Sequence, residues 1–333
     1  MLIFKNYKAD FGGLIDGGMI SHRFSSRGVH HIPVLVKEVV ENLNLKPNSA
    51  YIDCTVGEGG HALALLALPE TNNRLLGLDL DDQAIAISRA RLGKYGKNTT
   101  LIKGSYANLQ RVASEHGFIP ADAVLFDLGM SSLQVENPEK GFSFARTGPL
   151  DMRFDREQEL TAHKVVNQWS ENQITKIIAH FGEEPRARRL ARAIVDARPI
   201  ETTKDLADLI GRTLGGSRKK KIHPATLPFQ ALRMAVNLEL DNIRQGIRQA
   251  IGLMKHRGRM AVISYHSLED RLVKNILREE SSSCTCPPWT PECVCDQEAR
   301  IRHVSRKVIK PKEEEIRVNP RSRSARLRVI ERL

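Results

Sequence analysis

One stretch decides the fold: residues 51–61 read Tyr51-Ile52-Asp53-Cys54-Thr55-Val56-Gly57-Glu58-Gly59-Gly60-His61. The apolar residues at its start indicate a short strand, and the glycines allow positive φ and let a ligand approach the backbone closely. Asp79 follows 22 residues after Gly57, at the end of a second strand pattern. An acid at that place can accept both hydroxyls of a ribose, so the sequence predicts a site for a nucleoside-type cofactor.

The charges around this turn help to identify the cofactor. The turn also satisfies the dinucleotide pattern G-x-G-x-x-A, but a pyrophosphate favours bare amides at a helix N-terminus, and here Asp53 and Glu58 crowd the turn. S-adenosylmethionine (AdoMet) carries a sulfonium and an ammonium and no phosphate, so carboxylates suit it better. We therefore expect AdoMet, with a nicotinamide or flavin cofactor and a purely structural turn as open alternatives.

Strand and helix patterns alternate with short links on both sides of the turn. We expect strands at 50–55, 74–79, 99–103 and 123–127, and helices at 33–43, 61–68 and 82–95. This alternation predicts an α/β fold with a doubly wound, Rossmann-like parallel sheet. Charged helical patterns without strands follow at 161–169, 171–182, 185–196 and 203–214, before a helical stretch at 228–255, a strand at 259–264, a helix at 268–280 and a last strand at 324–331.

The expected domains follow from this change from alternating strand and helix patterns to helical patterns alone. Residues 30–134 and 226–333 form one α/β domain, residues 135–225 form an all-helical insertion, and residues 1–29 form a flexible N-terminal extension.

The chain of 333 residues has 51 Lys and Arg against 39 Asp and Glu, a net charge of +12. That surplus favours a polyanionic partner such as nucleic acid, with a simply basic soluble protein as the alternative. Without a membrane span or a secretory signal, we expect no membrane partner and a cytoplasmic protein.

Four cysteines cluster near the C-terminus: Cys284, Cys286, Cys293 and Cys295. Four thiolates suffice for a tetrahedral zinc ion, although the C-x-C spacing is tighter than the usual C-x₂-C. A structural zinc, unpaired thiols and disulfides all stay open, and the cytoplasmic setting favours metal over disulfide.

A second acidic strand end follows at Asp127, before the turn Gly129-Met130-Ser131-Ser132. In a doubly wound sheet this end opens on the ligand crevice. Asp127 can therefore face the cofactor or accept a hydrogen bond from a substrate amine, with an Asx turn or helix cap as the alternative. Ser131 is a candidate for chemistry and for capping alike.

Seven motifs in order resemble the ribosomal RNA small-subunit methyltransferase H family, at residues 31–35, 57–61, 127–134, 141–144, 148–153, 264–271 and 319–328. The resemblance spans about residues 30–333, including the helical insertion. It implies transfer of a methyl group from AdoMet to the exocyclic N4 of a cytidine in the decoding region of 16S ribosomal RNA. It also implies RNA recognition by the insertion, with 16S ribosomal RNA or the small ribosomal subunit as partner. A monomer and a homodimer stay open.

The resemblance also assigns the cofactor contacts to named positions: Gly59, Gly60, His61, Asp79, Asp127 and Gln134. An aromatic position after the third strand, often Phe in the family, falls on Tyr106, and its ring is expected to pack on the adenine.

The acceptor side of the site holds the catalytic candidates Asp127, Ser131 and His266. His266 follows a strand and can orient the base or relay a proton, with a structural histidine as the alternative. Tyr265 is expected to stack on a flipped base or to fill core. The remaining substrate candidates are Asp151 and Arg153, which can contact RNA or pair with each other, and the phosphate-binding run Arg218, Lys219 and Lys220. An amino-methyltransferase acting on DNA or another RNA is the alternative enzyme, and a non-catalytic, metal-stabilised nucleic-acid binder is the alternative of another class.

Overall fold

The computed structural model describes residues 32–69, 72–215, 223–284, 286, 292, 294–295, 297–305 and 307–333. The expected extension at 1–29 lies outside the described residues, and so do Arg218, Lys219, Lys220 and Cys293. The residues from Ile32 onward form one compact unit, and the description below concerns that unit.

Seven strands of the described chain form one sheet in the order β3-β2-β1-β4-β5-β7-β6. The strands are β1 (Ala50–Asp53), β2 (Arg74–Asp79), β3 (Thr99–Lys103), β4 (Ala121–Asp127), β5 (Met254–Ser264), β6 (Ile301–His303) and β7 (Arg326–Arg332). The first five pair in parallel, whereas β7 runs antiparallel to both β5 and β6. The order 3-2-1-4-5 is that of a doubly wound sheet, so the predicted fold class is confirmed. Only the last strands depart from a purely parallel sheet, and the three-residue β6 was not predicted.

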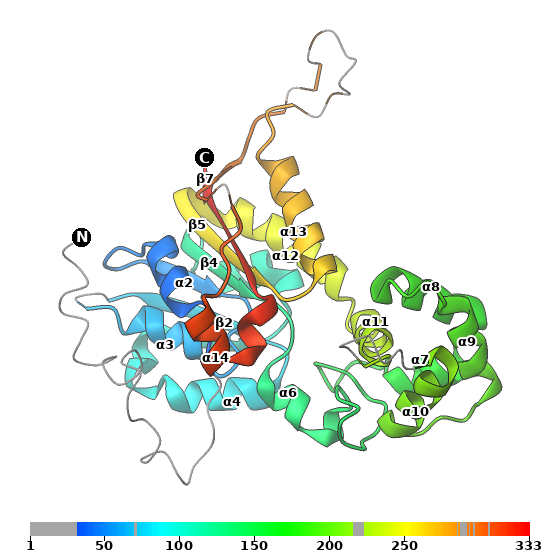
Figure 1. Cartoon of the computed structure of the whole chain (residues 1–333). Helices are drawn as coiled ribbons and strands as arrows, with labels where there is room; N and C mark the ends of the chain where they lie inside the picture. Colours follow the sequence, from blue (N-terminus) through cyan, green and yellow to red (C-terminus); the bar gives the residue numbers. More distant parts are fainter. Residues whose placement is uncertain are drawn as a thin grey trace. The chain divides into compact units, whose positions relative to one another are not determined.

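Helices cover both faces of the sheet (Figure 1). One face packs against α5 (Leu109–Glu115), α12 (Glu239–Leu253) and α13 (Ser267–Glu280), and the other against α2 (Val36–Leu43), α3 (Gly60–Leu66) and α4 (Asp82–Arg91). Successive strand residues point to opposite faces, so Ile52 joins the first apolar cluster and Tyr51 the second. Because both faces are buried, β1 and β4 are apolar almost throughout, and polar residues are left for their ends.

Five of the described helices between β4 and β5 build an apolar cluster of their own. They are α7 (Ala162–Gln168), α8 (Glu171–Gly182), α9 (Ala187–Asp196), α10 (Thr203–Leu214) and α11 (Thr226–Val236). The short helix α6 (Ser132–Glu136) precedes them. Val165, Ile178, Leu190 and Ile210 pack together there, and Leu232 of α11 joins them. The described residues between 135 and 225 include no strand, as expected. The cluster extends past residue 225, which was expected to be the boundary, because α11 packs on α8.

Two helical stretches differ most from their predicted bounds. The stretch 228–255 divides into α11 and α12 at Asn237 and Leu238, where Leu238 adopts a φ of 50°. The predicted helix 82–95 ends at Arg91, and a 3₁₀ helix (Gly93–Asn98) follows it. The shorter elements are 3₁₀ turns at Tyr106–Asn108, Pro138–Lys140 and Pro320–Ser324 and the helix α14 (Glu313–Val318). Among the described helices, none combines the length and apolarity that a bilayer crossing requires.

Candidate active site at the carboxyl ends of the strands

The glycine turn joins β1 to α3 and is packed on both sides. Gly57 and Gly59 have φ values of 50° and 75°, in the left-handed region that favours glycine. The Ser88 hydroxyl donates a hydrogen bond of 2.6 Å to the Gly57 carbonyl. A Cβ atom on Gly60 would lie 2.9 Å from the Pro33 ring. Side chains at these positions would therefore displace the turn, which holds its backbone close to the ends of β1 and β2.

Three carboxylates end the neighbouring strands β1, β2 and β4: Asp53, Asp79 and Asp127. Burial raises the pKa of Asp53 to about 8, with repulsion from Asp127 and Asp79 adding to the rise, although the Thr55 amide lowers it. Burial likewise raises the pKa of Asp79 to about 6. Among the described residues, no ion pair joins Asp53 or Asp79 to a lysine or arginine. A cationic ligand would favour the charged forms of these acids, so the site fits the sulfonium and ammonium of AdoMet.

Asp79 ties the glycine turn to the second strand. Its carboxylate accepts hydrogen bonds of 2.9 Å from the amides of Gly57 and Asp81. These bonds lower the pKa of Asp79 and partly offset the effect of burial. The predicted ribose acceptor therefore sits beside the glycine turn, as the spacing required.

Asp127 is oriented by groups from three other elements. The Tyr265 hydroxyl donates to Oδ1 of Asp127 over 2.7 Å, and the amide of Asp127 donates to Oγ1 of Thr55 over 2.7 Å. Nδ1 of His61 lies 3.6 Å from Oδ2 of Asp127, while Nε2 of His61 lies 2.8 Å from the Val34 carbonyl. Since only a protonated Nε2 can donate to that carbonyl, a second proton on His61 would turn its contact with Asp127 into an ion pair. Asp127 is thus held in one place for an incoming group.

Tyr265 acts as a hydrogen-bond donor in this structure. Its ring packs over Gly129, where a Cβ atom would lie 3.3 Å from Cδ2 of Tyr265. Burial raises the pKa of Tyr265 well above its usual value, and Asp127 raises it further, so the hydroxyl keeps its proton. Stacking on a flipped base stays a prediction, and the contact with Asp127 was not predicted.

His266 and Ser131 both cap helices. Nδ1 of His266 accepts from the Glu269 amide at the start of α13, and Nε2 of His266 lies 3.0 Å from Oε1 of Glu269. Ser131 begins α6 in a capping box with Gln134, each side chain accepting from the backbone amide of the other residue. The structure thus supplies the capping role that was the alternative for Ser131 and a structural role for His266. The catalytic roles of both stay predictions.

A buried cluster of polar side chains links the carboxyl end of β2 to the segment that leads into the insertion. The Asp81 carboxylate accepts from Nε2 of Gln134 over 3.3 Å and pairs with Nζ of Lys140, both of which are buried. Asp81 also caps α4 through the Gln83 amide. Gln134, a predicted cofactor contact, therefore reaches Asp79 through Asp81. We did not predict Lys140 or Asp81, although Asp81 lies two residues after Asp79.

A second contact joins β3 to the same insertion. Nζ of Lys103 lies 2.9 Å from Asp82, 3.4 Å from Asp155 and 2.8 Å from Glu157. Asp82 begins α4, whereas Asp155 and Glu157 belong to the loop before α7. These residues and the Lys140 pair fasten the insertion's first loops beside β2 and β3.

Tyr106 lies between β4 and α12. Its ring meets Phe126 edge-on, with ring centroids 5.5 Å apart and planes at 79°. A Cβ atom on Gly246 would lie 2.7 Å from Cδ2 of Tyr106, so the helix passes close to the ring. Burial raises the pKa of Tyr106 far above its usual value. The expected stacking on an adenine stays a prediction.

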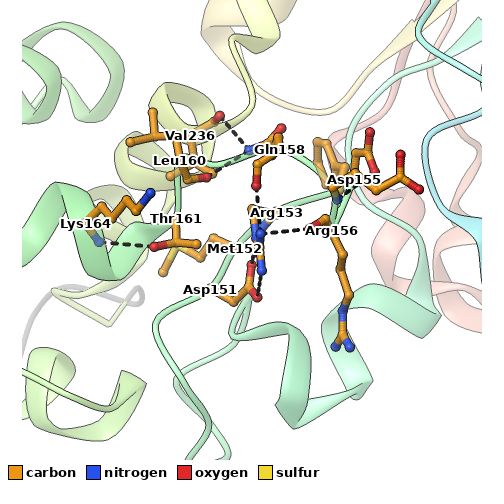
Figure 2. A network of polar contacts seen from close by, with 12 residues as sticks. Asp151, Met152, Arg153, Asp155, Arg156, Gln158, Leu160, Thr161, Lys164 and Val236 are labelled. Carbon is orange, nitrogen blue, oxygen red and sulfur yellow. Dashed lines mark hydrogen bonds and ion pairs between the residues drawn. The ribbon is translucent and has the colours of Figure 1, made fainter.

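Asp151 and Arg153 pair with each other in the loop before α7, as Figure 2 shows. Nε and Nη2 of Arg153 donate to the two carboxylate oxygens of Asp151 over 2.7 and 2.9 Å. Nη1 of Arg153 donates to the carbonyls of Arg156 and Gln158. The ion pair that was the alternative to RNA binding is therefore present. Direct RNA contact by these two residues stays a prediction, and it would require these bonds to open.

The same loop is anchored to the junction of α11 and α12. Asn237 donates to the Met152 carbonyl over 2.7 Å and accepts from the Phe154 amide over 2.8 Å. Next to it, Arg233 and Glu239 form a buried two-bond pair at 2.7 and 2.8 Å. Asn237 lies 83 and 85 positions from Phe154 and Met152, so the sequence gave no local signal for these bonds. Only the polar character of Arg233, Asn237 and Glu239 inside an apolar helical stretch could have indicated this junction.

The strand order, the glycine turn and the carboxylates around it define a class: AdoMet-dependent methyltransferases with a Rossmann-like sheet. The particular family follows from comparison with known proteins. The model of the MraW methylase family matches residues 28–333. The chain therefore belongs to the MraW methylase family.

Curated relatives agree over nearly the whole chain. Ribosomal RNA small subunit methyltransferase H of Dehalococcoides mccartyi is 46% identical over 303 residues, which cover 91% of this chain and 86% of that protein. The proteins of the same name from Thermomicrobium roseum and Clostridioides difficile are 45% and 42% identical; each alignment covers 91% of this chain and 94% and 99% of theirs. The resemblance predicted from seven motifs is confirmed. A solved rRNA methylase from Streptococcus thermophilus, 12% identical with a TM-score of 0.39 over 90% of this chain and 93% of that one, is too distant to carry an argument.

Proposed function

We propose that this protein methylates the exocyclic N4 of a cytidine in the decoding region of 16S ribosomal RNA, with AdoMet as the methyl donor. The observation that carries the proposal is Asp127, a carboxylate fixed by Tyr265 at the carboxyl end of β4, beside the glycine turn. The names of the curated relatives support ribosomal RNA of the small subunit as the substrate. The choice of N4 and of the decoding region rests on the motif resemblance.

The proposed roles on the cofactor side follow from charge. AdoMet supplies an electrophilic methyl on a sulfonium when it is bound. Gly59 and Gly60 let the ligand approach the backbone, and Asp79 accepts from ribose hydroxyls. Asp53, at the end of β1 beside the glycine turn, supplies negative charge to the cationic cofactor. His61, Tyr106 and Gln134 complete the predicted set around the cofactor.

On the acceptor side, the amine must be aligned and its lone pair drawn out of conjugation with the ring. Alignment at near-attack distance accounts for much of the acceleration in such transfers. A carboxylate has lone pairs for several hydrogen bonds, so Asp127 can accept from the amino group while it keeps Tyr265. The proton becomes acidic only as the methyl arrives, so a preorganised acceptor suffices and a strong base is not needed.

The proposed RNA surface includes the helical insertion. Arg188, Arg189 and Arg192 of α9 are exposed, and exposed arginines on one helix can neutralise phosphates without reading sequence. The basic run 218–221 belongs to the same proposal from sequence alone. The proposed partner is 16S ribosomal RNA, free or in the small subunit, and a cytoplasmic location stays a prediction.

The test is methyl transfer to defined acceptors. Purified protein receives radiolabelled AdoMet with unmethylated small subunits, naked 16S RNA or duplex DNA, and mass mapping locates the modified nucleoside. We expect N4-methylcytidine in ribosomal RNA with the native protein and a much lower yield with Asp127→Asn. Label in DNA alone would contradict the proposed RNA substrate. Failure of the protein to bind AdoMet would contradict methyltransferase activity of any kind. Methyl transfer from a sulfonium to an amine needs no metal. Any zinc that the protein binds would therefore have a structural role.

A further inference from the structure

Three cysteines converge in the connection between α13 and β6. The sulfur atoms of Cys284, Cys286 and Cys295 all lie within 4.8 Å of one another. The sulfurs of Cys284 and Cys295 are 3.9 Å apart, much farther than the roughly 2.05 Å of a disulfide bond. The sequence places a fourth cysteine, Cys293, between them, outside the described residues.

The spacing of these sulfurs suits a tetrahedral metal site. A zinc–thiolate bond of about 2.3 Å sets the edge of a tetrahedron of sulfurs at about 3.8 Å. Backbone amides also point at the sulfurs: the Cys286 amide donates to Cys284 over 3.4 Å, and the Val294 amide donates to Cys286 over 3.4 Å. Hydrogen bonds of this kind stabilise the thiolate form and orient metal ligands.

The described residues of the connection form no apolar core that would fold it. None of its described residues between 281 and 300 is buried, and Val294 is 77% exposed. Its base is fastened to the end of α13, where Gln297 donates to the carbonyls of Glu279 and Ser282. A short segment without a core commonly depends on a metal or disulfides for its structure.

We propose that Cys284, Cys286 and Cys295 bind one structural zinc ion. Each thiol releases its proton to solvent as its sulfur–zinc bond forms, and no electron is transferred. Zinc suits three thiolates at these distances, whereas magnesium and calcium require oxygen ligands. The site is independent of the proposed methyl transfer, because α13 runs about 20 Å from the active-site end of the sheet to the cysteines.

The experiment measures metal in the full chain, purified under reducing conditions after growth with zinc. We expect about one zinc per chain in the native protein and in the control Ser283→Ala, which alters an exposed residue of the same connection. Cys286→Ser and Cys295→Ser should each lose most of the zinc while their AdoMet affinity stays unchanged. Addition of cobalt to metal-free native protein should give the visible bands of a tetrahedral cobalt–thiolate site.

Two results would overturn this proposal. One is native protein that carries no zinc and gives no cobalt–thiolate bands. The other is a mass, under non-reducing conditions, that shows these cysteines joined as disulfides in freshly purified protein. Neither result depends on methyl transfer, so failure of the zinc site and failure of the proposed enzyme activity are separate outcomes.

Discussion

Two groups of buried or half-buried charged side chains in this protein differ in how their charges are balanced. Arg233 and Glu239 neutralise each other at the junction of α11 and α12 through two short hydrogen bonds. Asp53 and Asp79, at the strand ends, have no such partner among the described residues, and burial raises the pKa of each. Burial also raises the pKa of Glu239, but there Arg233 lowers it. A balanced pair maintains a structure, whereas an unbalanced group costs stability unless a ligand supplies the missing charge. The difference therefore separates a structural site from a binding site.

Breaking the balanced pair should have the largest effect. Arg233→Met leaves the Glu239 carboxylate buried without its partner, which costs about 3–5 kcal/mol of unfolding free energy. Chemical denaturation monitored by circular dichroism measures this loss. Removing both charges, in Arg233→Met with Glu239→Leu, should restore much of the stability, because no buried Glu239 carboxylate is then left without its arginine.

The matched control for that loss is an exposed pair. Arg244 and Asp241 lie 3.1 Å apart on α12, and both are largely exposed. Arg244→Ala should cost less than about 1 kcal/mol. Equal losses from the exposed and the buried variant would refute the distinction between them.

Asp127, the acid at the end of β4, should respond in activity. Asp127→Asn removes the negative charge and one acceptor site while it keeps the shape of the side chain. We expect methyl transfer to fall by about 100-fold or more, with little change in thermal stability. Tyr265→Phe should cost less, because it removes only the hydroxyl that orients Asp127. If Asp127→Asn kept full activity, another residue would have to be the acceptor.

Asp79 should affect affinity more than turnover. Asp79→Asn removes a charged acceptor, and hydrogen bonds to charged groups contribute about 1.5–3 kcal/mol, so AdoMet should bind about 10–100-fold more weakly. Isothermal titration calorimetry measures the dissociation constant. Asp82→Asn is the control, since that neighbouring carboxylate is exposed and pairs with Lys103. Unchanged affinity in Asp79→Asn would refute the ribose role.

The sequence predicted the strand-end acids well because their signals are local. A strand that ends in an acid, followed by glycines, identifies Asp53, Asp79 and Asp127 from the residues around them. The parallel part of the sheet follows from the same alternation. The antiparallel β7 and the three-residue β6 do not, because strand direction depends on the long connection before them.

The contacts of Asp127 and Asp81 escaped prediction because their partners lie far apart in the chain. Tyr265 reaches Asp127 across 138 positions, and Lys140 reaches Asp81 across 59. His266 is predicted to be a catalytic group because it follows a strand, and that role stays a prediction. The same position begins α13, where the His266 ring caps the helix. Whether a polar residue already has a partner in the fold is information that only the structure supplies.

The smallest predicted effect concerns pH. Asp53 and Asp79 have folded pKa values of about 8 and 6, above the usual 3.8. AdoMet has a net positive charge and favours the carboxylates, so its affinity should rise by about tenfold between pH 6 and 8. The unfolding free energy should fall over the same range, because the folded state binds more protons than the unfolded state. Asp53→Asn should flatten the upper half of the affinity profile.

Proton release on AdoMet binding tests the central claim most directly. The native protein is titrated with AdoMet at pH 7 by calorimetry in two buffers of different ionisation enthalpy. Because Asp53 is largely protonated at that pH in the cofactor-free protein, binding should release up to about one proton per AdoMet, and Asp53→Asn should release fewer. Binding without proton release, with the same affinity at pH 6 and pH 8, would contradict the account of the strand-end acids as the site of a cationic cofactor.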